Sequence, residues 1–187
     1  PVEVNFARVM ERVQKIVAAI EPHDSVERFT QLGVDCVQGQ ARIVSPWEVE
    51  VNGEVLTTRN IIIASGARPR VPEIPGLEAM DYLTSDTVWD IREAPSRLLV
   101  LGAGPIGCEL AQAFARLGSA VTLATHAGRV LPREDPEVSE QVHAAFTRQG
   151  IEVLLKHEPG AFSQSESGHC CAFTTPEGGR DVNFDRL

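Results

Sequence analysis

Aromatic residues, positive charge and long apolar runs are scarce in this chain of 187 residues. Only 5% of the residues are aromatic, and 17 lysines and arginines stand against 26 aspartates and glutamates, a formal net charge of −9. Proteins that bind nucleic acid usually carry a basic face, and no basic run occurs here, so we expect no nucleic-acid partner. No apolar stretch approaches the ~18 residues that span a bilayer, and no signal-peptide pattern is visible, so no membrane segment is expected.

Cysteine is also sparse. The four cysteines lack the spacing of a disulfide framework, a CxxC motif or a metal site. A reduced, cytoplasmic protein is therefore the expectation. Cys170 and Cys171 are adjacent, and neighbouring side chains of an extended strand point to opposite faces, so the two make a poor dithiol. Cys108 is interpreted as a small buried residue.

What is present is an ordinary globular composition, 43% apolar and 23% charged, in a length that allows one large domain or two small ones. The chain begins with Pro1 rather than methionine and stops at Leu187, just after a strand-like stretch. We therefore expect an internal fragment of a longer protein.

The first half contains two helical patterns followed by strands. Apolar periodicity predicts an amphipathic helix over about 5–20 and a second short helix that stops at Gly33. Asn52-Gly53 has the composition of a type I′ hairpin turn. The apolar run 61–64 is typical of a strand that is buried on both faces. Short strands are also expected over 34–38, 41–44 and 48–51.

Beyond the prolines that begin at Pro69, strands and helices alternate. Strands are expected over 98–101, 120–124 and 151–155, with helices over 105–117 and about 136–149. This alternation predicts a parallel sheet with right-handed crossovers, and the remainder suits three short antiparallel strands. The predicted class is α/β, with one lobe over residues 1–90 and a second over residues 91–187.

A glycine motif marks the second lobe. Gly102-Ala-Gly104-Pro105-Ile106-Gly107 directly follows a predicted strand and opens the next helix, which is the context of a dinucleotide-binding fingerprint. Gly102 permits the tight turn, Gly104 lets a pyrophosphate approach the backbone, and Gly107 lets the helix lie close to the sheet. The helix N-terminus then attracts phosphate. We predict a Rossmann-like NAD(P)-binding domain in which these residues contact the cofactor; the alternative is a chance match in a glycine-bearing turn.

The end of the second strand bears on the choice of cofactor. NAD-binding units usually place a carboxylate there for the ribose 2′-hydroxyl. No acidic residue occurs from Ser119 to Arg133, and the strand end reads Ala124-Thr-His126-Ala-Gly-Arg129. A 2′-phosphate would form charge-assisted hydrogen bonds with Arg129 and His126, so NADP(H) is favoured over NAD(H). The alternative is that both are ordinary solvated residues.

Together these residues resemble the pyridine nucleotide-disulfide oxidoreductases, flavoproteins that include dihydrolipoamide dehydrogenase, mercuric reductase and glutathione reductase. One part of the resemblance is the fingerprint, extended through Cys108-Glu109-Leu-Ala. The other is Ile61-Ile-Ile-Ala64-Ser65-Gly66-Ala-Arg-Pro, which is similar to the strand and turn that lead from the FAD domain into the NAD(P) domain, with serine in place of the usual threonine. The missing strand-end carboxylate and the run Leu131–Pro136 look more like the mercuric reductase branch.

The resemblance implies that residues 1–90 form the later part of an FAD-binding domain and residues 91–187 an NAD(P)-binding domain without its last strand. Ala64, Ser65 and Gly66 match positions near the FAD. Glu109 matches a glutamate near the nicotinamide, although it also suits a solvated carboxylate favoured by the helix dipole. The family's first glycine fingerprint, its CxxxxC redox pair and its C-terminal dimerisation domain have no counterpart here.

The full-length parent is accordingly implied to be a homodimer that passes a hydride from NAD(P)H to FAD and on to a disulfide or metal acceptor, while the fragment itself is expected to be inactive. Two alternatives belong to other classes. A short-chain dehydrogenase is disfavoured because Tyr82, the only tyrosine, has no lysine four residues later. A non-catalytic dinucleotide-sensing or interaction module on the same fold stays open, because a fold does not dictate function.

Overall fold

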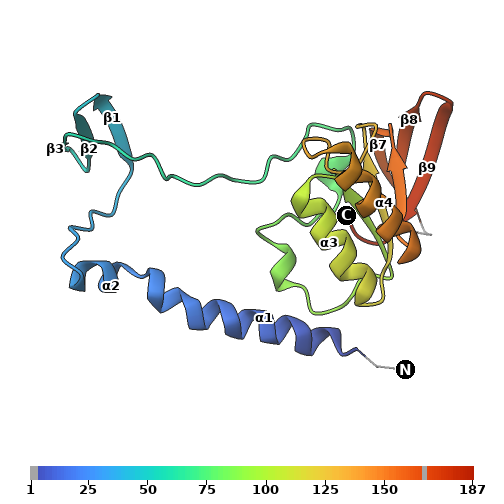
Figure 1. Ribbon diagram of the computed structural model, residues 1–187, viewed down its shortest axis with the longest axis horizontal. Coiled ribbons are helices and arrows are strands. Elements are labelled where there is room, and N and C mark those ends of the chain that lie inside the picture. The colour runs from blue at the N-terminus through green and yellow to red at the C-terminus, as the bar shows by residue number, and fades with distance from the viewer. Residues whose placement is uncertain (1–3, 166–167) are drawn as a thin grey trace. The chain divides into compact units, whose positions relative to one another are not determined.

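The computed structural model describes residues 4–165 and 168–187 (Figure 1). The chain forms two compact units, one of Arg12–Arg68 and the other of Pro1–Glu11 with Pro69–Leu187. This boundary differs from the lobe boundary at residue 90 that the sequence predicted. The physical reason is burial: Leu77, Met80 and Val88 lie between the two boundaries and are 4–8% exposed in the core of the C-terminal unit.

The helix predicted at the start of the chain is confirmed as α1 (Phe6–Ile20). Its first turns pack within the C-terminal unit, where Phe6 and Met10 are buried and the Phe6 and Phe114 rings lie 5.8 Å apart between centroids. A 3₁₀ turn (Glu21–Asp24) leads to α2 (Val26–Gln31), whose N-cap Ser25 accepts a hydrogen bond from the Arg28 N–H.

The hairpin predicted at Asn52-Gly53 is also confirmed. Both residues have positive φ, 53° and 81°, as a type I′ turn requires. They join β2 (Glu48–Val51) to β3 (Glu54–Thr57), and β1 (Ala41–Ser45) completes a three-stranded antiparallel sheet.

Two predicted strands of this unit are wrong. Residues 34–38 are irregular, and so is the apolar run 61–64, in which Ile62 is 89% and Ile63 74% exposed. A strand that is buried on both faces needs paired neighbours and covering layers. Among the described residues of Arg12–Arg68 the only sheet is the small one of β1–β3, which does not pair with this run.

The C-terminal unit is built on a parallel sheet in the order β4-β5-β6, which confirms the predicted alternation of strand and helix. The strands are mostly apolar, and Gly118 and Gly150, both at positive φ, end the turns that follow the helices. The elements are β4 (Arg97–Leu101), α3 (Pro105–Arg116), β5 (Ala120–Thr125), α4 (Pro136–Arg148) and β6 (Glu152–Leu155).

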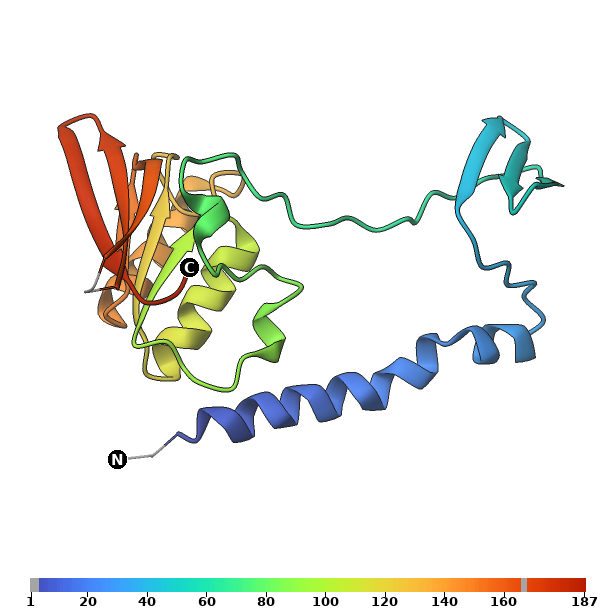
Figure 2. The same cartoon turned by 180° about the vertical axis from the view of Figure 1, so that it is seen from behind.

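The predicted meander follows as β7 (Glu158–Ser165), β8 (Gly168–Thr175) and β9 (Gly178–Phe184). Because successive strand residues face opposite ways, Leu98 and Val121 join one apolar cluster with the helices, whereas Leu99 and Ala124 join a second cluster with the meander. The parallel sheet is therefore a middle layer, with helices on one face and the meander on the other (Figures 1 and 2).

The last residues of the chain lie along the edge of β4 that faces away from β5. Leu98 and Arg186 form a parallel bridge, and the Leu99 N–H donates to the Arg186 carbonyl at 3.0 Å. Asp185 holds this segment through Arg97, whose backbone N–H donates to Oδ2 at 2.9 Å and whose Nε donates to Oδ1 at 3.1 Å.

The fold class predicted from sequence, a mixed α/β protein with a parallel sheet, is thus confirmed. In the stretches 4–165 and 168–187, no helix is both long and apolar enough to cross a bilayer.

Candidate dinucleotide-binding site

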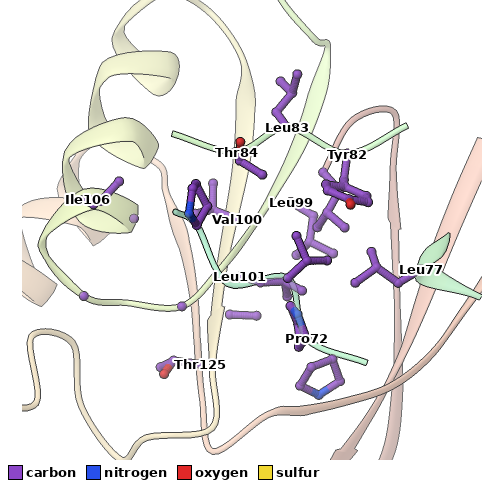
Figure 3. A pocket seen from close by; sticks show the side chains of 18 of the residues that line it. Pro72, Leu77, Tyr82, Leu83, Thr84, Leu99, Val100, Leu101, Ile106 and Thr125 are labelled. Carbon is purple, nitrogen blue, oxygen red and sulfur yellow. The ribbon is translucent and has the colours of Figure 1, made fainter. Parts of the chain in front are cut away.

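A cavity of about 1120 Å³ lies at the carboxyl ends of the parallel strands in the C-terminal unit. In an open parallel sheet this edge is where ligands bind. Figure 3 shows its interior, where the side chains of Leu99, Val100 and Leu101 of β4 lie between Ile106 of α3 and Leu77. The lining also includes Pro69–Pro75, Tyr82–Ser85, Gly102, Gly104–Gly107, Ala124–His126 and His157–Pro159.

The glycine turn has the geometry that its sequence predicts. Gly102 has φ +98°, in the left-handed region, and its N–H donates to the Ala124 carbonyl at 2.8 Å, which ties the turn to β5. Gly107 lies so close to the turn that a Cβ there would collide with the Gly102 carbonyl oxygen. The third glycine therefore permits close helix–turn packing.

Gly104 is different, because a Cβ at this position would meet no atom within 4 Å. Its φ of −77° is ordinary for any residue, so neither packing nor backbone conformation requires glycine here. Gly104 lines the cavity directly before α3. The bare backbone leaves room at this point for a ligand to approach.

The first turn of α3 supplies hydrogen-bond donors beside that opening. The N–H of Cys108 donates to the Gly104 carbonyl at 3.0 Å and makes the first hydrogen bond of the helix. The N–H groups of Ile106 and Gly107 come before it in the chain and therefore have no acceptor within the helix. Ile106 is 59% exposed on the cavity side, and Pro105 begins the helix. Aligned N–H groups and the positive end of the helix favour a bound phosphate.

The end of β5 carries no carboxylate. Thr125 is buried and its hydroxyl accepts a hydrogen bond from the Ala127 N–H at 3.2 Å, while the exposed His126 lines the cavity. Arg129 is not part of the lining. Its Nη2 donates to the carbonyls of Pro132 at 2.8 Å and Glu134 at 3.1 Å, so the guanidinium closes the loop that follows the strand.

Other predicted site residues do not join the cavity. Glu109 is exposed on α3 and is absent from the lining. Ala64, Ser65 and Gly66 belong to the Arg12–Arg68 unit, where they form an exposed, irregular segment with Gly66 at φ +70°.

Sequence reasoning missed the lining residues at the end of β6. His157 Nδ1 lies 2.7 Å from the Leu155 carbonyl, and its N–H donates to the Thr125 carbonyl at 2.9 Å, so it is held against the end of β5. Glu158 lies beside it in the lining. A signal was available, since the ends of neighbouring parallel strands meet at one edge.

The cysteines offer no redox pair. Burial raises the pKa of Cys108, whose thiol lies 3.5 Å from the Ala103 carbonyl. Burial raises the pKa of Cys171 to about 12, and this residue is fully buried while Cys170 is partly exposed, as expected for neighbours on a strand. Among residues 4–165 and 168–187, no three His, Cys, Asp or Glu side chains are grouped to hold a metal ion.

A glycine turn, a helix N-terminus and an open cavity at the carboxyl edge of a parallel sheet are features of the Rossmann-type fold. A family model for the pyridine nucleotide-disulphide oxidoreductases matches residues 5–187. The chain belongs to this family, as its sequence motifs indicated.

The relatives support the same assignment. Mercuric reductase from Lysinibacillus sphaericus is 40% identical over 152 residues, which cover 81% of this chain and 28% of the relative. The HOCl-induced flavoprotein disulfide reductase RclA from Escherichia coli superposes with a TM-score of 0.78 at 27% identity, over 99% of this chain and 42% of that one. A water-forming NADH oxidase from Lactobacillus brevis, solved with NADH bound, superposes with a TM-score of 0.59 at 25% identity. This match covers 79% of this chain and 35% of the oxidase chain. The chain thus spans less than half of each relative.

Proposed function

We propose that the C-terminal unit binds the nicotinamide dinucleotide of a flavin-dependent oxidoreductase. The observation that carries the proposal is Gly104, where a bare backbone that packing does not require faces an open cavity at the start of α3. The pyrophosphate fits this position because the N–H groups of Ile106 and Gly107 lie next to it. The NADH bound to the Lactobacillus brevis relative is consistent with such a ligand.

The proposed cofactor is NADP(H) in preference to NAD(H). An NAD-specific unit uses a carboxylate at the end of the second strand to bind the ribose 2′-hydroxyl, and a carboxylate there would repel a phosphate. Here β5 ends in Thr125, and the next residue in the cavity lining is His126. Neither is negatively charged, so the 2′-phosphate is tolerated and can accept hydrogen bonds.

For the longer parent protein we propose the chemistry that the family implies. The bound NAD(P)H supplies a hydride, two electrons and one proton, to the flavin, and the electrons pass on to a disulfide or metal acceptor. The Ala64–Gly66 segment is exposed and irregular within the Arg12–Arg68 unit, and no step at the flavin is assigned to its residues. The contribution of this chain is to hold the dinucleotide, and homodimerisation of the parent is proposed through parts outside it.

The test is a pair of glycine variants in the full chain. Gly104→Val adds a branched side chain at a position of the cavity lining where a Cβ meets no atom within 4 Å. The matched control Gly179→Val places the same side chain on β9, where a Cβ meets only the Phe173 carbonyl at 3.9 Å. NADPH and NADH are titrated into each protein by calorimetry, and thermal unfolding checks the fold.

We expect Gly104→Val to lose binding of both dinucleotides with an unchanged unfolding temperature, while Gly179→Val binds like the unsubstituted chain. Unaltered binding by Gly104→Val would overturn the proposed site. Equal affinity of the unsubstituted chain for NADPH and NADH would overturn the proposed preference alone.

A further inference from the structure

We infer that Lys156, acting with His126, is the cation that recognises the 2′-phosphate of the dinucleotide. The inference rests on the proposed function and specifies a residue that the fingerprint does not contain. It begins from Arg129, which would otherwise be the obvious cation but whose guanidinium donates to the Pro132 and Glu134 carbonyls. These bonds hold the guanidinium inside its own loop.

The strand register brings Lys156 to the site. Thr125, the last residue of β5, is paired with Leu155, the last residue of β6. In a parallel sheet the residues that follow two paired positions leave the same edge side by side. His126 and Lys156 are those residues, although 29 positions separate them in the sequence.

Contacts with the β5 loop hold Lys156 there. Its backbone N–H donates to the Ala127 carbonyl at 3.0 Å. Its aliphatic stem crosses the bare backbone of Gly128, because Cε lies 3.6 Å from the position that a Cβ on that glycine would occupy. The ammonium group, one bond beyond Cε, therefore lies beside the loop that follows β5, where the ribose of a Rossmann-bound dinucleotide is read.

The backbone conformation of Lys156 is unusual for a lysine. Its φ is +56°, in the left-handed region where side chains other than those of glycine, asparagine and aspartate are uncommon. A lysine at such a position costs backbone strain that glycine would avoid. Strained residues of this kind cluster at ligand-binding sites.

The charge of Lys156 is available to a ligand. Across residues 4–165 and 168–187, no carboxylate forms an ion pair with it, and the residue is exposed. A carboxylate does occur two residues further along the chain, on Glu158 in the cavity lining. An ammonium group is a compact point charge that binds phosphate from many directions, which suits an exposed site.

The experiment uses substitutions that the backbone accepts. Lys156→Asn and Lys156→Gly both suit a positive φ and remove the charge, so neither is expected to unfold the chain. Lys15→Gln removes the only other lysine, an exposed residue of α1, and is the control. The probes are NADPH and NADH, together with adenosine 2′,5′-bisphosphate and 5′-AMP, which differ only in the 2′-phosphate.

Loss of one charge-assisted phosphate contact should lower affinity for NADPH and the bisphosphate by about tenfold or more. We expect both Lys156 variants to show this loss, with unchanged binding of NADH and 5′-AMP, and Lys15→Gln to show none. Unchanged NADPH affinity in both Lys156 variants, with all four ligands still binding, would overturn the inference and leave the dinucleotide site in place. Failure of the unsubstituted chain to bind any of the four would overturn both.

A second readout does not depend on substitution. Because the chain has only two lysines, an amine-acetylating reagent reports on each by mass spectrometry. We expect adenosine 2′,5′-bisphosphate to protect Lys156 from acetylation, and 5′-AMP to protect it less, while Lys15 reacts equally in all samples. Equal acetylation of Lys156 with and without the bisphosphate, at a concentration that saturates binding, would contradict the contact.

Discussion

Gly107 presents its Cα directly to the carbonyl oxygen of Gly102, across the turn that joins β4 to α3. No side chain fits between them, so α3 can begin at Pro105 only because the third glycine of the motif lacks a Cβ. The first and third glycines therefore form the turn, whereas Gly104 between them leaves a space that the fold itself does not use.

This difference predicts that a substitution at Gly107 lowers stability, whereas one at Gly104 lowers dinucleotide binding. Gly107→Ala should lower the free energy of unfolding by about 1–3 kcal/mol, the usual cost of overpacking, because the added methyl group meets backbone that cannot rotate away. Chemical denaturation of the full chain measures the change. The Gly104→Val variant serves as the comparison, and a Gly107→Ala protein as stable as the unsubstituted chain would contradict the packing constraint at Gly107.

Arg129 should act on loop order rather than on cofactor choice. Arg129→Ala removes the donors that reach the Pro132 and Glu134 carbonyls, so amide hydrogen exchange in the loop around residues 130–135 should become faster. Affinity for NADPH and NADH should fall together, leaving their ratio unchanged. Arg129→Lys, which keeps the charge but not the planar fork, should behave like Arg129→Ala; retention of NADPH preference only in the lysine variant would instead make Arg129 the phosphate ligand.

The buried thiol of Cys171 should make stability fall at alkaline pH. Burial raises its pKa to about 12 from an ordinary value near 9, so the folded state holds the proton more tightly than the unfolded state. The stabilisation is therefore complete below about pH 9 and is lost as pH rises toward 12. Unfolding by urea across this range should show a smaller decline for Cys171→Ala than for the control Cys36→Ala, and identical slopes would contradict the burial of this thiol.

Asp185 should stabilise the edge of β4 to an extent that depends on pH. The hydrogen bond from the Arg97 side chain lowers the pKa of this carboxyl, so its contribution is present above about pH 4 and is lost as pH falls through the folded-state value. Asp185→Asn should speed exchange of the Leu99 amide, which donates to the Arg186 carbonyl. The effect should be small because both partners are partly exposed, and it should vanish in acid, where both proteins lack the charge.

Local patterns were sufficient to predict much of the C-terminal unit. The run Leu98–Leu101, the glycine motif and the helix after it were identified because each depends on neighbours within a few residues. The same holds for the Asn52-Gly53 turn, where backbone conformation alone selects the residues. The exposed run 61–64 was predicted wrongly for the complementary reason: it has the composition of a buried strand, but burial needs partners that the unit does not provide.

The site shows the same division. Gly102, Gly104 and Gly107 could be read from spacing, and the missing carboxylate after β5 is a fact of composition. The role of Arg129 could not be read, because a positive charge near a strand end does not reveal whether carbonyls of its own loop already occupy it. His157 and Lys156 could not be placed from the sequence, because only the pairing of β6 with β5 brings them to the end of β5.

The amino-acid order alone determined that a glycine turn follows β4 and where the helix after it begins, because such a turn depends only on the backbone freedom of a few neighbouring residues. The tertiary structure alone decided which charged side chains stand around that turn. Hydrogen bonds and strand register act between residues far apart in the chain, and they hold Arg129 in its loop while bringing Lys156 beside the loop that follows β5.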